Sequence, residues 1–338
     1  MTVLDKTIAS KKARNLKAGL AVTITLIALA GVVWLYLPLP NTPGRPGEGE
    51  KHSIFSDDFE HVYYERGAGP VIVLLPSLGR PASDFNELTS ELANAGFRTI
   101  AVDLNVSRKT STEPDGNLLQ LAESVDAVIS ALGLQETERV VVIGHAFGNR
   151  LARAYAATHA GRVQAVILLA AGGRIPIEKD IRESLRDVFD PGITKFARSQ
   201  ALRKAFFAKT SLIPSYWRIG WDKSLAEIQI QATRTTLYEE WWDAGGVPLL
   251  VIQGDEDSIA PAAHTSELLE AEFGDLVSVS IASPAGHALL PEQPVFIANT
   301  IIAYLNKETT AVIPLYSYAE FTYPESSPSN SDARRVVQ

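Results

Sequence analysis

Short apolar runs alternate with segments of helical periodicity over most of the chain, and this alternation constrains the fold more than any other feature. It is typical of a parallel sheet with helices on both faces. The sequence therefore predicts the α/β class with a mostly parallel sheet. The expected strands are 71–75, 99–103, 139–143, 165–169, 248–253 and 277–281, and the expected helices are 83–95, 118–132, 146–159, 262–273 and 294–305.

The alternation is interrupted once, between the strand ending near Leu169 and the strand starting near Pro248. This interval is too long for a plain strand-to-helix connection. We expect an inserted helical cap, at about 174–243, over the carboxyl edge of the sheet, where open α/β sheets bind ligands. Its aromatic residues could pack in the core of the cap or line a pocket, and the sequence leaves both readings open. They are Phe206, Phe207, Tyr216, Trp217 and Trp221.

An uncharged apolar segment at 18–39 is long enough to cross a bilayer as a helix. Five basic residues precede it, against the single acid Asp5, and Trp34 and Tyr36 lie near its far end, where an aromatic belt is expected. The charge bias predicts a single-pass anchor with residues 1–17 in the cytoplasm and the rest of the chain on the outer side. The basic residues are Lys6, Lys11, Lys12, Arg14 and Lys17.

A cleaved signal peptide is the alternative, because Ala28-Leu29-Ala30 resembles a cleavage site. Cleavage there would leave a very apolar new N-terminus, so an uncleaved anchor is favoured. Residues 40–51 are dense in Pro, Gly and charge and predict a linker. The globular domain is expected at 52–306, followed by a flexible tail at 307–338.

Composition excludes several classes of function. The net charge is -8 without a basic face beyond the N-terminus, which argues against a nucleic-acid partner. The absence of cysteine excludes disulfides, thiolate nucleophiles and Cys-ligated zinc. The six histidines show no metal-binding spacing, and we expect neither a metal nor a cofactor.

The most informative motif begins with the buried strand Val140-Val141-Val142-Ile143 and continues as Gly144-His145-Ala146-Phe147-Gly148 into a helix. The glycines allow a tight strand-to-helix turn that holds the central side chain outward, as in a nucleophile elbow. The central residue of such an elbow is usually serine, and here it is Ala146.

Two further elements follow in the order acid and histidine. Gly254-Asp255-Glu256-Asp257 comes directly after the strand at 248–253, and Gly286-His287 lies about thirty residues later, beyond the last predicted strand. With these residues, 52–306 resembles the α/β-hydrolase family. The resemblance implies that Asp257 is the triad acid, His287 the general base and Ala146 the occupant of the nucleophile position. Asp255 competes for the acid role, but the Gly-x-x-Asp spacing favours Asp257.

The resemblance also implies an oxyanion hole, formed by the backbone N–H groups of Leu78 and Phe147. The sequence departs from the family pattern twice: Pro76-Ser77 replaces His-Gly, and Ala146 has no attacking oxygen. Ser77 is a weak candidate for a substitute nucleophile, because its position is not an elbow. His145 is expected to pack or hydrogen-bond beside the elbow.

Three readings of function remain. The first is a hydrolase-like protein that acts on a small or acyl-bearing apolar substrate, with His287 and Asp257 activating water. The second is an inactive member of the fold that binds a ligand or protein. The third is an engineered Ser-to-Ala variant of a serine esterase.

Overall fold

The computed structural model describes residues 3–38, 42–56, 59–108 and 116–312. Its centre is an eight-stranded sheet in the order β1-β2-β4-β3-β5-β6-β7-β8. From β4 to β8 all neighbours pair in parallel. The predicted α/β class and mostly parallel sheet are thus confirmed. The six predicted strands are β3 (Val71–Leu75), β4 (Arg98–Arg108), β5 (Val140–His145), β6 (Val163–Leu169), β7 (Leu249–Gly254) and β8 (Val277–Ala282).

An antiparallel hairpin of β1 (Glu50–Ser56) and β2 (Phe59–Arg66) was not predicted, and β2 pairs antiparallel with β4. In β2, buried His61 and Tyr63 alternate with partly exposed residues. This alternation is typical of a strand near the edge of a sheet. Because β2 contains no continuous apolar run, the sequence did not indicate it as a strand. The sheet begins at Glu50, two residues before the expected start of the domain at His52.

Helices cover both faces of the sheet. Successive side chains of a strand point to opposite faces, and the central strands carry continuous apolar runs, so both faces must be buried. In β3, Val71, Val73 and Leu75 pack on the face of α3 and α4, whereas Ile72 and Leu74 pack on the face of α2 and α10. The helices of these layers are η1 (Ala82–Phe85), α2 (Asn86–Asn94), α3 (Leu118–Ala131), α4 (Phe147–Thr158), η2 (Ala160–Arg162), η6 (Ala262–His264), α8 (Ser266–Phe273), η7 (Gly274–Leu276), α9 (Leu289–Glu292) and α10 (Pro294–Val312). Helix α10 extends beyond the predicted start of the tail at 307, and residues 313–338 lie outside the described part.

The insertion between β6 and β7 is helical and forms its own apolar core. Phe206, Phe207, Trp217 and Trp221 are buried in this core, and Tyr216 packs against it. The cap aromatics therefore serve mainly to hold the cap together. The elements of this region are α5 (Lys179–Asp187), α6 (Lys195–Ala205), η3 (Ser215–Arg218), α7 (Lys223–Thr235), η4 (Tyr238–Glu240) and η5 (Ala244–Gly246).

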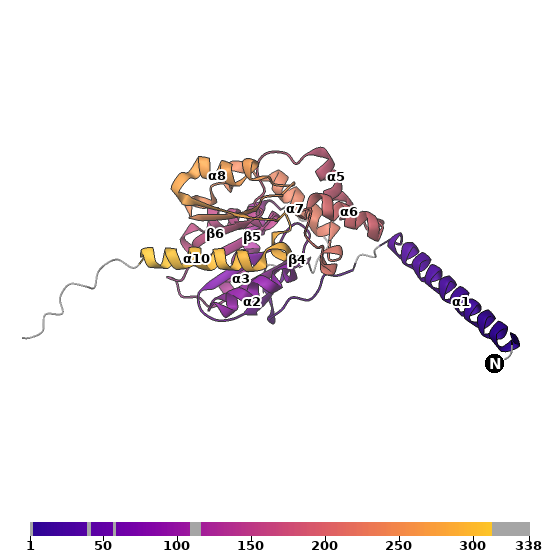
Figure 1. Cartoon of the computed structure of the whole chain (residues 1–338). Helices are drawn as coiled ribbons and strands as arrows, with labels where there is room; N and C mark the ends of the chain where they lie inside the picture. Colours follow the sequence, from indigo (N-terminus) through magenta and orange to yellow (C-terminus); the bar gives the residue numbers. More distant parts are fainter. Residues whose placement is uncertain (1–2, 39–41, 57–58, 109–115, 313–338) are drawn as a thin grey trace, which may run out of the picture.

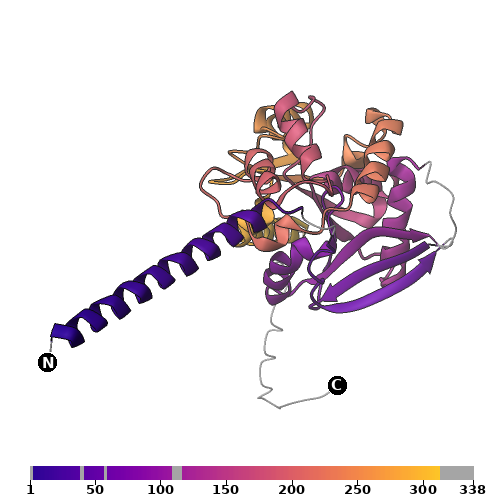
Figure 2. The same ribbon diagram turned by 90° about the vertical axis from the view of Figure 1, so that its right-hand side faces the viewer.

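Helix α1 (Val3–Leu35) projects away from the domain (Figures 1 and 2). Its segment Arg14–Leu35 is long and apolar enough to span a membrane, and none of it is buried in the protein. The helix ends at Leu35, before the predicted boundary at 39. The residues that follow dock on α6, where Leu37 O accepts a hydrogen bond of 3.2 Å from Lys195 N and Tyr36 stacks on Phe196.

The segment predicted as a linker contains no helix or strand from Thr42 to Gly49, but it packs on the domain. Arg45 forms two hydrogen bonds with Glu87 and a third with the carbonyl of Ser83. Its guanidinium lies 3.6 Å from the ring centroid of Tyr216 in the cap. This segment thus contacts both the α2 layer and the cap, which an unconstrained linker would not do.

Candidate active site

The turn between β5 and α4 has the backbone geometry of an elbow. Ala146 has φ 50° and ψ -106°, an unfavourable conformation for a residue with a Cβ atom. A Cβ atom on Gly144 would lie 2.3 Å from the backbone of Gly148, and one on Gly148 would lie 2.1 Å from the carbonyl oxygen of Leu75. Only glycine fits at these two positions, so the motif holds Ala146 at a sharp turn.

The contact between Gly148 and the end of β3 places the loop after β3 against the elbow. Gly148 lies against the carbonyls of Leu75 and Pro76, so Ser77 and Leu78 follow directly from the point of contact. Phe147 is the first residue of α4, and the first N–H groups of a helix have no partner within the helix. The structure therefore brings the two segments of the expected oxyanion hole, at Leu78 and Phe147, to the same place.

The cap holds this loop in position. Gly79 N donates a hydrogen bond of 2.8 Å to the side-chain oxygen of Gln229 in α7. Arg80 is buried, binds both carboxylate oxygens of Asp84, and donates to the carbonyl of Ile219 in the cap. The conformation of the loop thus depends on the cap as well as on the sheet.

His287 and Asp257 form a buried pair, with 2.8 Å between His287 Nδ1 and Asp257 Oδ2. Asp257 Oδ1 accepts from the backbone N–H groups of Ile259 and Ala260. The carboxylate is therefore held rigidly and fixes the imidazole with Nε2 as the remaining nitrogen. Asp255, the rival acid, instead accepts from Ser283 Oγ and Ala285 N.

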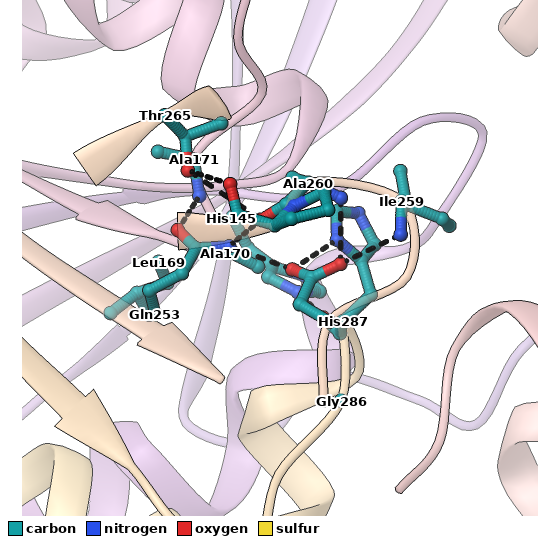
Figure 3. A network of polar contacts seen from close by, with 12 residues as sticks. His145, Leu169, Ala170, Ala171, Gln253, Ile259, Ala260, Thr265, Gly286 and His287 are labelled. Atoms are coloured by element: carbon teal, nitrogen blue, oxygen red, sulfur yellow. Dashed lines mark hydrogen bonds and ion pairs between the residues drawn. The ribbon is translucent and has the colours of Figure 1, made fainter. Parts of the chain in front are cut away.

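Gln253, the polar residue near the end of β7, was not expected at this site. Its Nε2 donates 2.8 Å to the same oxygen of Asp257 that binds His287, and its Oε1 accepts from Ala171 N (Figure 3). Gln253 is fully buried and ties the acid to the end of β6. A glutamine that ends a buried apolar strand was the available signal in the sequence.

His145 is buried beneath the pair and faces it. Its Nε2 lies 2.9 Å from the carbonyl oxygen of His287, and its ring centroid lies 5.9 Å from that of His287. Burial and the neighbouring His287 lower the pKa of His145 to about 4. The neutral imidazole therefore donates from Nε2 to the carbonyl and supports the backbone of the histidine loop.

The cap closes over His287. Phe206 lies with its ring centroid 5.8 Å from that of His287, and its carbonyl accepts a hydrogen bond from Ala288 N. Glu292 accepts from the N–H groups of Gly286 and Ala208, so one carboxylate joins the histidine loop to the cap. Burial raises the pKa of Glu292 above its usual range.

A cavity of about 390 Å³ lies beside this centre, bounded by the segment at 42–46, the loop after β3 and the cap. Gly79 and Arg80 line it from the loop, Trp221 from the cap and Asp103 from the sheet. Burial raises the pKa of Asp103. The cavity adjoins the oxyanion loop, but Ala146 and His287 are not among its lining residues.

Comparison with known proteins agrees with this architecture. Residues 72–300 match the model of the alpha/beta hydrolase family. A non-heme haloperoxidase of Rhodococcus erythropolis is 25% identical over 232 residues, covering 63% of this chain and 84% of that protein.

Solved structures are similar at the level of the fold. A bacterial membrane phospholipase A has a TM-score of 0.62 at 20% identity, covering 91% of this chain and 99% of its own. The carboxylesterase CesB of Bacillus subtilis has a TM-score of 0.63 at 16% identity, covering 77% and 92%.

Proposed function

Since the chain belongs to the alpha/beta hydrolase family, we propose that it is a hydrolase-like protein in which His287 acts as a base on bound water. The observation that carries this proposal is the buried pair of His287 and Asp257, at 2.8 Å. A carboxylate that fixes the imidazole leaves the second nitrogen free to take a proton near neutral pH.

Ala146 limits the mechanism. A methyl group cannot attack a carbonyl, so the reaction would not pass through an acyl-enzyme. Water would attack the substrate carbonyl as His287 takes one of its protons, and the N–H groups of Leu78 and Phe147 would stabilise the developing oxyanion. When the tetrahedral intermediate collapses, the bond to the alcohol or amine would break, and His287 would return the proton to that leaving group. Phe206, whose ring lies beside that of His287, gives the site an apolar wall and favours a small or acyl-bearing apolar substrate.

A non-catalytic role as a ligand-binding protein is the second candidate. Ala146 favours this role, because loss of the serine from a triad typically reduces turnover about a millionfold. This protein would bind its ligand in the capped site and release it unchanged.

We infer that the protein is anchored by the part of the predicted segment 18–39 that is helical, which ends at Leu35, with its domain on the outer side of the membrane. The exposed apolar surface of Arg14–Leu35 supports the span, and the basic residues before it support the orientation. A cleaved signal sequence would have the same length and composition as such an anchor.

The site is tested with a panel of short-chain p-nitrophenyl esters and three forms of the full-length protein: the parent, Ala146→Ser, and Ala146→Ser combined with His287→Ala. We expect Ala146→Ser to raise the rate at least about a hundredfold, because it adds the attacking oxygen to a site that already holds the His287–Asp257 pair. The second substitution should abolish that gain.

The parent and its His287→Ala variant separate the two candidates. Slow turnover by the parent that disappears in His287→Ala supports water activation, whereas turnover that survives this change excludes it. Saturable ligand binding with no chemical change in any ligand favours the binding protein.

A further inference from the structure

Two arginines of α4 meet on the side of the helix that faces the end of β6. Arg153 is fully buried, whereas Arg150, one turn earlier, is partly exposed. Arg153 Nη2 donates a hydrogen bond of 3.1 Å to the carbonyl of Gly172. A Cβ atom on Gly172 would lie 3.2 Å from Arg150 Nη2, so both guanidinium groups pack against the same glycine.

Two tryptophans of the segment before β7 cover these arginines. The guanidinium of Arg153 lies 4.6 Å from the ring centroid of Trp241 and 4.4 Å from that of Trp242, and that of Arg150 lies 5.5 Å from Trp241. Contacts of this kind stabilise a cation but do not neutralise it.

No carboxylate among the described residues pairs with either arginine. Glu272, the carboxylate of this region, is engaged by Arg174 and by Trp242 Nε1. Two buried donors of the cluster, Arg153 Nη1 and Trp241 Nε1, have no acceptor within the described residues. Burial lowers the pKa of Arg150, and it lowers that of Arg153 to about 9.

Two adjacent positive charges without a counter-charge are costly in a region of low dielectric constant, and a bound anion would remove that cost. We propose that Arg150 and Arg153 form a binding site for a phosphate group. A phosphate monoester or inorganic phosphate carries between one and two negative charges at pH 7, which suits two guanidinium groups that no carboxylate pairs with.

The two arginines differ in burial, and we expect them to differ in their contact with the phosphate. Arg150 is the less buried of the two and would bind the phosphate oxygens through its fork of N–H groups, whereas the fully buried Arg153 strengthens the positive potential. The site is one to two turns along α4 from Ala146 and involves neither His287 nor Asp257, so it does not depend on the proposed reaction.

The test is the thermal unfolding of the full-length protein in a non-ionic detergent, with sodium phosphate titrated against sodium chloride at equal ionic strength. We expect a saturable rise in Tm of about 2–5 °C with phosphate. The rise should disappear in Arg150→Gln and persist in Arg66→Gln, a control outside the cluster because Arg66 of β2 pairs with Glu48.

A second arm uses mixed micelles of phosphatidic acid, a lipid phosphate monoester, with phosphatidylcholine micelles as the reference. Stabilisation by inorganic phosphate supports a site for the free group, and stabilisation by phosphatidic acid alone supports a site for a lipid phosphate. An equal response of the parent and Arg150→Gln overturns the proposal, as does the absence of a saturable response in both arms.

Discussion

Ala146 retains a strained conformation although its side chain carries no reactive atom. A non-glycine residue at φ 50° and ψ -106° costs on the order of 1–3 kcal/mol, which its surroundings must offset. Its N–H donates to Leu169 O and its carbonyl accepts from Asn149 N, both within 3.1 Å. The turn is therefore imposed by the junction of β5, β6 and α4, and a serine introduced there would point its side chain in the same direction as Ala146.

His145 makes the stability of the fold sensitive to acid. Its pKa of about 4 in the folded protein is below the value of about 6.5 expected in the unfolded chain. Between these values the unfolded chain binds a proton that the folded protein does not, so stability falls as the pH drops from about 6.5 to 4. The total loss is on the order of 3 kcal/mol.

We expect His145→Gln, which keeps a side-chain N–H donor, to lose this part of the pH dependence. Urea unfolding of the full-length parent and variant between pH 7 and pH 4.5 measures it. Asp84, Asp257 and His287 also interact electrostatically with His145, so the comparison rests on the difference between the two proteins. Parallel loss of stability in both would show that His145 is not responsible.

At the scale of elements, the elbow depends on the close approach of α4 to β3. We expect Gly148→Ala to destabilise the protein by about 2–4 kcal/mol, because its Cβ atom would lie 2.1 Å from a backbone oxygen. Gly161→Ala is the matched control, since no atom lies within 4 Å of its added Cβ, and it should change stability by no more than about 0.5 kcal/mol. Equal destabilisation by both, measured as the free energy of unfolding in urea, would contradict this account of the turn.

The strands that form the centre of the sheet could be predicted because they are apolar on both faces, and the hairpin of β1 and β2 could not because its pattern is mixed. The pairing of His287 with Asp257 was implied by the resemblance to the α/β-hydrolase family, which rests on the order of elbow, acid and histidine along the chain. Gln229 and Glu292 were missed because they join segments distant in sequence, as in the bonds from Gly79 N to Gln229 and from Ala208 N to Glu292. Spacing along one chain carries no signal for such contacts.

At the scale of the whole molecule, the N-terminal helix is attached to the cap rather than to the sheet. Lys195 of α6 lies with its Nζ 3.5 Å from the ring centroid of Trp34, and Pro38 forms a β-bridge with Thr194. If α1 spans a membrane, the cap is the part of the domain joined most directly to it. The docking residues all follow Ala30, so these contacts would survive a cleavage there and do not distinguish an anchor from a signal peptide.

The mass of the protein isolated from cells distinguishes them. An uncleaved anchor retains the full 36.6 kDa, whereas cleavage after Ala30 removes about 3 kDa. We expect the full mass, recovery in the membrane fraction after washing with alkaline carbonate, and digestion of the domain by protease added from the outer side. Ala28→Leu with Ala30→Leu removes the small residues of the cleavage signature while keeping the segment apolar, so it should leave an anchored protein unchanged. A shorter parent whose full length is restored by this double substitution would identify the segment as a signal peptide.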